Sequence, residues 1–345
     1  MNDDSPGEQY RPSSVILVVN PMPRLYIESL ASTLLERGNV RVLTFYRSPL
    51  FDDALRERLT ALGAELTQFT FVGLFDEFVQ LRKAAALLKA WLRRPRTTVF
   101  HCQPNHFLTN YATFGLSARQ KVSVNLMPDG VANFYETNTA PYERAMRIKQ
   151  LIAPLAGLSF TPYSGDYLAL ATGGYGEYWY FGDPGLMDSH LRVREFPAPA
   201  RPASAQAHID TRTLFLGQPT SGTDLFDDTY HELLSRIIKR YPGAVYKPHP
   251  AERFDDARRS FLTSLGFAIL ETDLPAEWIA ADFTRVIGVV SSVLFNVRLL
   301  GWSDNVLCIP DTTLLMRLTG RNEAEIATIL DGAYRLGINP VPMWR

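Results

Sequence analysis

Short apolar runs alternate with segments of helical spacing along the first half of the chain. The first run begins at Ser14 and stops at Asn20-Pro21, and a segment of helical periodicity follows it up to Gly38-Asn39. Unbroken apolar runs bounded by turn residues indicate buried strands, whereas a period near 3.6 residues indicates a helix. By the same criteria we expect strands at 40–45, 64–72, 97–102 and 121–126, and helices at 52–63 and 76–94. Apolar strands separated by helices predict a parallel sheet covered on both faces.

The alternation stops near residue 195 and restarts after residue 210. The stretch 195–210 is rich in Pro, Ala and Ser, which is typical of a linker. Beyond it we expect strands at 212–217, 243–247, 267–271, 286–290 and 305–309, and helices at 224–240, 252–265, 276–281, 292–300 and 322–332. The pattern predicts an α/β protein of two Rossmann-like domains, 14–194 and 211–345, which face each other across a central cleft. We expect residues 1–13 to be disordered, and the last helix could pack back on the first domain.

Composition excludes several classes of protein. The 345 residues carry a formal net charge of −1, so the global basic field of a nucleic-acid binder is absent and we expect no nucleic-acid partner. The two cysteines, Cys102 and Cys308, lie in apolar runs and form neither a disulfide framework nor a zinc spacing. The first dozen residues lack the apolar middle of a secretory signal, and no run approaches the ~20 apolar residues of a membrane span. We therefore expect a cytoplasmic protein.

Three unusual segments directly follow predicted strands. They are "MPDGVANFYE" after 121–126, "KPHP" after 243–247 and "SSVLFN" after 286–290. Ligands of open α/β sheets bind beyond the carboxyl ends of the strands, so we expect all three segments to border one cleft.

Each of these segments also has a purely structural interpretation. Asp129-Gly130 after a proline is a turn signature as well as a candidate catalytic carboxylate. Lys247 and His249 place two cationic or donor groups at a strand end, as an anionic ligand requires, but a solvated loop histidine explains the same residues. Ser291 or Ser292 is a good N-cap, and the same geometry suits a phosphate.

Other motifs carry little weight. The acidic pairs Asp52-Asp53, Asp227-Asp228 and Asp255-Asp256 fall in first turns of predicted helices, where carboxylates stabilise the helix end, so we expect no metal site there. The segment "GGYG" at 173–176 lacks the context of a dinucleotide fingerprint, and no phosphate-loop motif occurs.

The order of the remaining signals resembles the bacterial sialyltransferases and polysialyltransferases of GT-B fold. In those families an acidic-acidic-Gly motif, an HP motif and a Ser/Thr-rich motif surround a CMP-sugar donor. The counterparts here are Asp129-Gly130, His249-Pro250 and Ser291-Ser292, and Glu277 stands in place of the carboxylate that holds the nucleotide ribose. Pro128 departs from the pattern because it occupies the position of the first acidic residue, and this leaves the transferred sugar open between sialic acid and a related 2-keto acid sugar such as Kdo.

The resemblance implies direct displacement with inversion and no metal. Asp129 would activate the acceptor hydroxyl, and His249 would stabilise the departing CMP. The residues expected on the donor side are Gly130, Gly217, Gln218, Lys247, Pro250, Glu277, Ser291 and Ser292. The acceptor would be a surface glycan of the lipooligosaccharide or capsule type.

Two other functions remain open. One is a GT-B transferase or an epimerase that uses a UDP- or GDP-sugar, and the other is a non-catalytic sugar-binding subunit of a polysaccharide assembly system. On the acceptor side Asn20, Tyr178 and Trp179 are candidates, although the pattern around the two aromatic residues favours an apolar strand packed into the core of the first domain. The basic segment 82–96, with Trp91 and several leucines, fits a helix that touches the anionic inner membrane, and a solvated helix packed by its leucines is the alternative.

Overall fold

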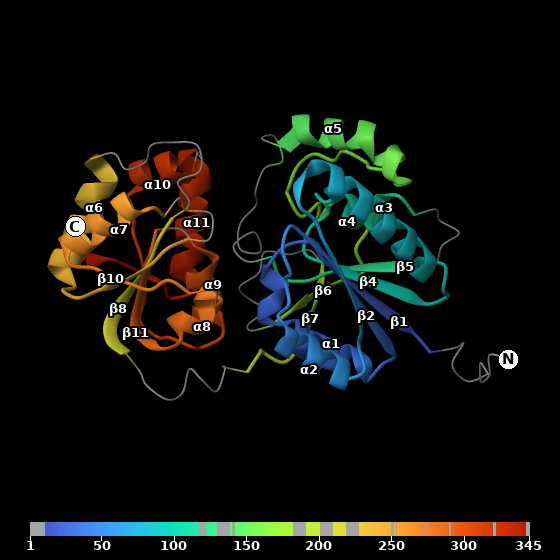
Figure 1. Cartoon of the computed structure of the whole chain (residues 1–345), viewed down its shortest axis with the longest axis horizontal. Coiled ribbons are helices and arrows are strands. Elements are labelled where there is room, and N and C mark those ends of the chain that lie inside the picture. The colour runs from blue at the N-terminus through green and yellow to red at the C-terminus, as the bar shows by residue number, and fades with distance from the viewer. Residues whose placement is uncertain are drawn as a thin grey trace. The chain divides into compact units, whose positions relative to one another are not determined.

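The chain forms two α/β units. The computed structural model describes residues 11–116, 122–129, 139, 142–181, 191–200, 210–218, 228–249, 252, 254–272, 274–289, 291–319 and 322–342. Contacts divide the chain into Met1–Pro199 and Ala200–Arg345, and each unit contains one parallel sheet with helices packed on both faces (Figure 1). The predicted fold class, two parallel-sheet α/β domains, is confirmed.

The first unit contains a seven-stranded parallel sheet in the order β3-β2-β1-β4-β5-β6-β7. Its strands are β1 (Ser13–Val18), β2 (Asn39–Tyr46), β3 (Glu65–Thr70), β4 (Thr97–His101), β5 (Val122–Leu126), β6 (Glu177–Tyr180) and β7 (Arg192–Glu195). The winding direction reverses between β1 and β4. In open α/β sheets the crevice beyond the carboxyl ends at such a reversal is where ligands bind. The segments after β1 and β4 therefore mark the first place to look for a site.

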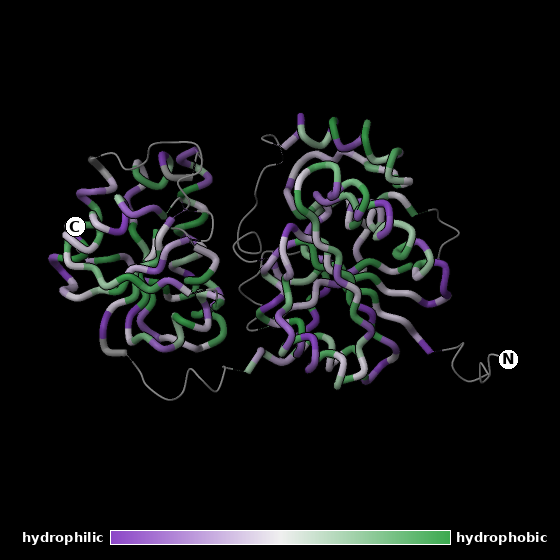
Figure 2. The backbone as a smooth tube through the Cα atoms, viewed as in Figure 1, coloured by the Kyte–Doolittle hydropathy of each residue, from purple (hydrophilic) through white to green (hydrophobic). Residues whose placement is uncertain are grey.

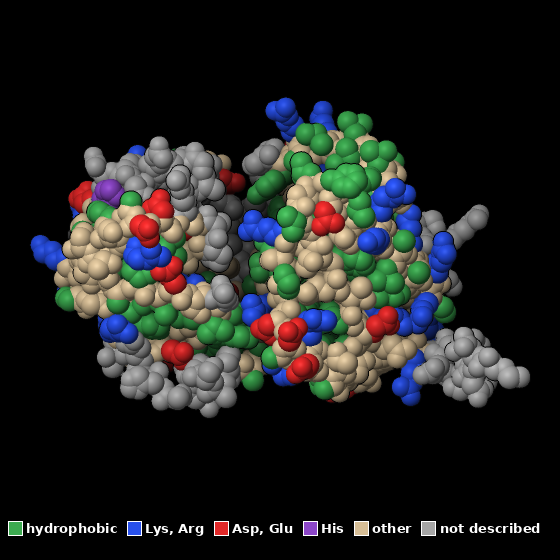
Figure 3. All heavy atoms as spheres, viewed as in Figure 1, with side chains coloured by type: hydrophobic (Ala, Val, Ile, Leu, Met, Phe, Trp, Pro, Cys, Tyr) green, Lys and Arg blue, Asp and Glu red, His purple; other side chains and the backbone are tan. Residues whose placement is uncertain are grey.

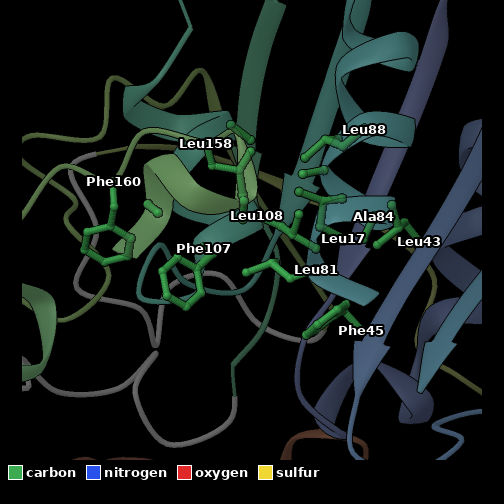
Figure 4. Packing of buried hydrophobic residues seen from close by; sticks show 14 of the residues in the cluster. Leu17, Leu43, Phe45, Leu81, Ala84, Leu88, Phe107, Leu108, Leu158 and Phe160 are labelled. Carbon is green, nitrogen blue, oxygen red and sulfur yellow. The ribbon is translucent and has the colours of Figure 1, made fainter. Parts of the chain in front are cut away.

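Helices cover both faces of this sheet (Figure 1). On one face lie α1 (Ile27–Leu35) and α2 (Asp53–Ala61), and on the other α3 (Gly73–Leu92) and α4 (Phe107–Phe114). Figure 4 shows Leu81, Ala84 and Leu88 of α3 packed toward Leu17 of β1 and Leu43 of β2, and all five belong to one buried cluster. Burying an aliphatic side chain of this size contributes about 1.5–3 kcal/mol, so this packing fixes α3 firmly on the sheet.

The same packing corrects the expectation for segment 82–96. Leu88, Trp91 and Leu92 are buried in the core cluster, and the Arg41 guanidinium lies 5.9 Å from the centre of the Trp91 ring. Their apolar surface is therefore already covered by protein and is not available to a membrane. The packed-helix alternative describes this segment, whose basic side chains Arg82, Lys83, Arg93 and Arg94 are exposed.

Another helix lies outside α3 and α4. It is α5 (Glu143–Ile152), which continues into the 3-10 turn η5 (Ala153–Ala156). The turn η5 packs against α3, and Lys89 Nζ of α3 donates to the Gly157 carbonyl directly after it. Figure 1 shows α5 as the outermost element on this face of the sheet.

The second unit repeats the arrangement with six parallel strands in the order β10-β9-β8-β11-β12-β13. These strands are β8 (Asp210–Leu216), β9 (Val245–Lys247), β10 (Ala268–Ile269), β11 (Phe283–Gly288), β12 (Val306–Cys308) and β13 (Asn339–Pro340). The helices are α6 (Asp228–Arg240), α7 (Asp256–Leu265), α8 (Ala276–Ala280), α9 (Ser292–Leu299), α10 (Thr312–Thr319) and α11 (Glu323–Arg335). The winding reverses between β8 and β11, and the last helix, α11, packs against α10. Among the described residues, no helix is long and apolar enough to cross a bilayer.

Candidate active site

A carboxylate lies at the carboxyl edge of the first sheet, where two strand ends meet. Asp129 follows β5 and Asn20 follows β1, and Asn20 Nδ2 donates to Asp129 Oδ1 at 2.6 Å. The Asn20 side chain is itself oriented, because its Oδ1 accepts from the Met22 backbone N–H at 3.2 Å. The amide group therefore presents a donor to the carboxylate.

The residue before Asp129 is held by a side chain at the start of α1 and by another directly after β4. The Pro128 carbonyl accepts from the Tyr26 hydroxyl at 2.6 Å and from Cys102 Sγ at 3.1 Å. Tyr26 is fully buried against Phe181 and Phe196, so its hydroxyl cannot move away. Pro128 thus serves as a buried anchor that holds the Asp129 backbone in place.

The electrostatics of Asp129 suit acid–base chemistry. Asp129 is half-buried, and desolvation raises its pKa to about 7, while the hydrogen bond from Asn20 opposes the rise. Its charge in turn helps to raise the pKa of Tyr163, Tyr167 and Tyr178. A general base works best when its pKa lies near the operating pH, so the environment tunes this carboxyl as a catalytic base requires. Gly130, the next residue of the motif, lies outside the described residues.

A polar cluster after β4 was not expected from the sequence. Lys149 of α5 donates to the Asn105 carbonyl at 2.5 Å and to Asn105 Oδ1 at 3.0 Å, and the Tyr167 side chain also hydrogen-bonds Asn105. Burial lowers the pKa of Lys149. The one available signal was the polar, proline-containing stretch "HCQPNH" at 101–106, because it follows a strand at the winding reversal.

A cavity of about 230 Å³ lies beside this cluster. It is lined by Glu143, Met146, Arg147, Pro162, Tyr163 and Ser164. Tyr163, which lines the cavity, is one of the tyrosines whose pKa the charge of Asp129 helps to raise.

The two aromatic residues expected on the acceptor side are part of the core. Tyr178 and Trp179 belong to β6 and are 1% and 2% exposed. The Trp179 ring contacts Phe100 edge-on, and the guanidinium groups of Arg37 and Arg194 lie 4.9 and 5.2 Å from its centre. Their rings are covered, so stacking on a sugar does not fit this structure and the packed-strand interpretation accounts for both residues.

In the second unit, strand ends converge at Gly217. Gly217 follows β8, and its N–H donates to the Lys247 carbonyl at 2.9 Å. A Cβ at this position would lie 2.6 Å from Glu252 Oε2 and 2.7 Å from the Tyr246 hydroxyl, so only glycine permits the close approach. Gln218, the next residue, is buried and its backbone bonds the Tyr230 side chain.

A buried carboxylate holds the loop that carries His249. Glu252 Oε2 accepts from the His249 backbone N–H at 2.9 Å, and the Glu252 N–H donates back to the His249 carbonyl at 2.8 Å. Glu252 Oε1 accepts from the Tyr246 hydroxyl at 2.8 Å and pairs with the buried Arg258 at 2.6 Å. Glu252 therefore positions the histidine loop, and no signal in the sequence singled it out.

The two cationic candidates of this loop differ in environment. His249 is half-buried, and desolvation followed by the charge of Lys247 lowers its pKa. Lys247 is buried and its Nζ donates to the Thr272 carbonyl at 3.0 Å. The ligand-free histidine is thus mainly neutral at pH 7 and the lysine has a structural contact. Pro250 lies outside the described residues.

Glu277 and the serine pair meet at α9. Ser291 is the N-cap, since its Oγ accepts from the Val293 N–H at 3.3 Å, and Ser292 is the first helical residue. Asn296, one turn further along, donates to Glu277 Oε1 at 2.9 Å, and burial raises the pKa of Glu277. The capping interpretation of Ser291 is therefore correct, and it leaves a phosphate role open because the two roles do not exclude each other.

The sheet order places these segments next to one another within the second unit. The strands β9, β8 and β11 are neighbours, so the loops that carry His249, Gly217 and Ser291 leave adjacent carboxyl ends. In the first unit the structure brings Asn20 and Asp129 into direct contact. The expectation that residues of both domains border one cleft stays a prediction. Within the described ranges, no group of three or more His, Cys, Asp and Glu side chains is arranged to hold a metal ion.

Comparison with known proteins supports a glycosyltransferase. A model of glycosyltransferase family 52 matches residues 200–300. The structure is similar to UDP-GlcNAc 2-epimerase from Neisseria meningitidis bound to UDP-GlcNAc, with a TM-score of 0.50 and 10% identity over 94% of this chain and 91% of that one. A UDP-glucosyltransferase from Polygonum tinctorium is similar at a TM-score of 0.49 and 10% identity, over 95% and 94% of the two chains. No curated protein sequence matches the chain. The neighbours have the GT-B fold of glycosyltransferases and epimerases.

Proposed function

We propose that this protein is an inverting, metal-independent glycosyltransferase that moves sialic acid, or a related 2-keto acid sugar such as Kdo, from a CMP-sugar to a hydroxyl of a surface glycan. The observation that carries the proposal is Asp129, a carboxyl with a pKa near 7 that Asn20 holds at the carboxyl edge of a Rossmann-like sheet. The family match and the fold support the class of enzyme, whereas the CMP-sugar rests on the motif resemblance.

In this proposal Asp129 is the general base. Its carboxylate removes the proton of the acceptor hydroxyl as that oxygen attacks the anomeric carbon of the donor, and the bond from this carbon to the CMP phosphate breaks. Asp129 ends protonated and CMP leaves as a phosphate monoester with one additional negative charge. A single displacement by one nucleophile inverts the anomeric configuration. Base catalysis of this kind contributes about 10²- to 10⁴-fold to the rate.

The second unit would hold the donor. The family-52 match spans His249, Glu277 and the pair Ser291-Ser292, which are the elements that the resemblance assigns to the nucleotide. His249 would donate a hydrogen bond to the phosphate, and the growing negative charge would favour its protonated form. The two serines and the free amides at the start of α9 would contact the same phosphate, and Glu277 would accept from the ribose hydroxyls. In this scheme those donors stabilise the negative charge of the phosphate without a metal ion. Transfer should therefore persist in the presence of EDTA.

A donor screen tests the proposal. The full-length protein is incubated with CMP-sialic acid, CMP-Kdo and a set of glycan acceptors, and the products are identified by mass spectrometry. We expect an acceptor mass increase of one 2-keto acid sugar together with release of CMP. Transfer from a UDP- or GDP-sugar, with none from either CMP-sugar, would contradict the proposed donor.

The UDP-sugar alternative has one specific observation in its favour. The structural neighbour at a TM-score of 0.50 is an epimerase bound to UDP-GlcNAc. Calorimetric titration of CMP, UMP and GMP distinguishes the CMP-sugar hypothesis from the UDP-sugar hypothesis. We expect CMP to bind at least tenfold more tightly than either of the other two nucleotides. Equal binding of UMP would favour the UDP-sugar enzyme. A non-catalytic subunit would bind a nucleotide or sugar but transfer nothing with any donor.

A further inference from the structure

The outer face of α5 and of the turn η5 that follows it carries an apolar stripe that no described residue covers. Its members are Ile148, Leu151, Ile152 and Leu155, and their exposed fractions run from 40% at Ile152 to 77% at Leu151. The positions follow the spacing i, i+3, i+4, i+7, which gathers side chains on one side of a helix. The inner face of the same helix is apolar as well, because Met146 and Ala153 are buried in the core cluster. We call the four exposed residues the α5 stripe.

This arrangement is the reverse of an ordinary surface helix, which turns polar residues outward. In Figure 2 the outward crests of α5 have the colour of hydrophobic residues, and Figure 3 shows hydrophobic side chains with basic ones among them over this part of the first unit. A contiguous apolar patch with a polar rim marks an interaction site on a soluble protein. The stripe therefore has the character of an interaction site.

Charge indicates which partner this is. Helix α5 contains three basic residues, Arg144, Arg147 and Lys149, against the single acidic residue Glu143. Arg144 and Arg147 are exposed and lie one turn before Ile148 and Leu151, so they border the stripe at its N-terminal end. A two-fold contact through the centre of the stripe would place the arginines of the two copies at opposite ends of the contact and would offer them no anionic partner. An anionic lipid surface instead attracts them while it accepts the apolar side chains.

A second group of exposed apolar side chains lies at the start of α3. Val72, Leu74 and Phe75 are each at least 84% exposed. Two residues later Glu77 is close enough to α5 for the charge of Lys149 to lower its pKa, although burial raises that pKa more. Two exposed apolar segments therefore occur on the part of the first unit that α5 and the start of α3 form.

We propose that the α5 stripe and its arginines dock the first unit on an anionic membrane surface, with the residues at 72–75 as a second point of contact. The proposal replaces segment 82–96, whose apolar side chains are buried, as the membrane-facing element. Helix α5 also lines the cavity beside the Asn105 cluster, through Glu143, Met146 and Arg147. One helix would thus contact lipid through its stripe and line this cavity through Glu143 and Met146. The docking does not depend on which sugar nucleotide is the donor.

Vesicle flotation of the full-length protein tests this. The vesicles contain phosphatidylglycerol and phosphatidylcholine, or phosphatidylcholine alone, at low ionic strength. We expect binding to the anionic vesicles only, with a fall in the bound fraction as salt is added. Leu151→Ser with Leu155→Ser should lower the apparent partition constant at least tenfold, because two exposed side chains lose their apolar surface. Arg144→Gln with Arg147→Gln should lower it by about tenfold or more, at roughly 1 kcal/mol per charge.

The control exchanges exposed apolar residues elsewhere. Leu62→Ser with Tyr334→Ser removes side chains that are 42% and 43% exposed, and it should float like the wild type. Circular dichroism and thermal unfolding establish that every variant is folded. Absence of wild-type flotation with anionic vesicles would overturn the proposal, as would equal flotation of the Leu151/Leu155 variant. Light scattering covers the remaining case: a dimer that the Leu151/Leu155 exchange dissociates, without vesicle binding, would make the stripe a contact between copies and refute membrane docking.

Discussion

At the scale of single residues, the decisive contact joins two side chains 109 positions apart. Asn20 and Asp129 meet because β1 and β5 end at the same edge of one parallel sheet. Two opposing effects set the pKa of the Asp129 carboxyl: burial raises it, and the hydrogen bond from Asn20 lowers it. The result, a pKa of about 7, is far from the value near 4 of a solvated aspartate and suits a base that works at neutral pH.

We expect Asp129→Asn to reduce transfer by about 10²- to 10⁴-fold while CMP affinity stays nearly unchanged, because the base acts on the acceptor. Asparagine keeps the shape of the side chain and can still accept from Asn20. Initial rates with a CMP-sugar, together with calorimetric titration of CMP, measure both effects. Asp166→Asn is the matched control, since that carboxylate accepts from the Leu170 N–H in the same unit, and it should leave transfer within about twofold. Retention of more than half the wild-type rate by Asp129→Asn would remove Asp129 from the catalytic role.

The pH profile depends on the same carboxylate. The base must be ionised, so kcat/KM for the acceptor should rise with pH and level off above about 7. The raised pKa also means that the folded state binds more protons than the unfolded state between the ordinary pKa and 7, so this group makes stability fall as pH rises through that window. Asn20→Ala removes the hydrogen bond that lowers the pKa, and it should move the rising limb of the profile to higher pH. An unchanged limb in Asn20→Ala would mean that another group controls the rate.

At the scale of elements, the sequence pattern located the strands best where they are buried on both faces. The runs at 14–18, 40–45 and 97–102 form β1, β2 and β4, because a continuous apolar run has no other stable location than the centre of a covered sheet. The strands β7 and β13 and the helices α4, α5 and α10 were not predicted.

The sequence could predict only those residues of the candidate site that directly follow a strand. Asp129, His249 and Ser291 could be found because each follows an apolar run and interrupts it with polar residues. Glu252 and Asn296 could not be found in this way, since each acts through a tertiary contact: one with the His249 backbone and the other with Glu277. Burial also excludes Tyr178 and Trp179 as residues that stack on a sugar. Whether an aromatic residue is buried depends on tertiary packing, which a local sequence pattern does not contain.

The start of α9 gives a prediction that separates capping from phosphate binding. Ser291→Ala with Ser292→Ala should weaken CMP binding at least tenfold, because each hydrogen bond to a charged group is worth about 1.5–3 kcal/mol. Loss of the Ser291 cap should also cost about 1 kcal/mol of stability. Asn322→Ala is the control, as it removes the N-cap and capping box of α11 and should cost similar stability without any change in CMP affinity. Wild-type CMP affinity in the double variant would mean that the serines only cap their helix.

The loop between β9 and α7 should depend on Glu252 for its stability. Glu252→Ala removes the carboxylate that pairs with the buried Arg258, and breaking a buried pair in this way costs about 3–5 kcal/mol. Glu271→Ala is the control, because its ion pair with Arg259 is exposed and should contribute less than about 1 kcal/mol. Urea unfolding compares the two variants. If Glu252→Ala unfolds at the same urea concentration as Glu271→Ala, the buried pair does not hold the histidine loop.

At the scale of the whole molecule, the two units divide the candidate chemistry between them. The proposed base and its asparagine belong to the first unit, and the His249 loop, Glu277 and the start of α9 belong to the second. Each group is assembled by contacts within its own sheet and helices, so each unit can be examined for ligand binding separately. Binding of the nucleotide and binding of the acceptor should therefore protect different segments of the chain from hydrogen exchange.

Hydrogen exchange of the full chain can detect this division. With CMP at about 100 times its dissociation constant, a site that must open to exchange is stabilised by up to about 2.7 kcal/mol, which slows exchange by up to roughly a hundredfold. We expect that slowing at 215–218, 245–249 and 291–296, at the carboxyl ends of β8, β9 and β11 respectively, and no change at 20–26 or 126–129. Asp129→Asn should give the same CMP pattern as the wild type, because the base does not contact the nucleotide in this proposal. Protection that appears at 126–129 and not at 291–296 would place CMP on the first unit and would overturn the assignment of the donor to the second.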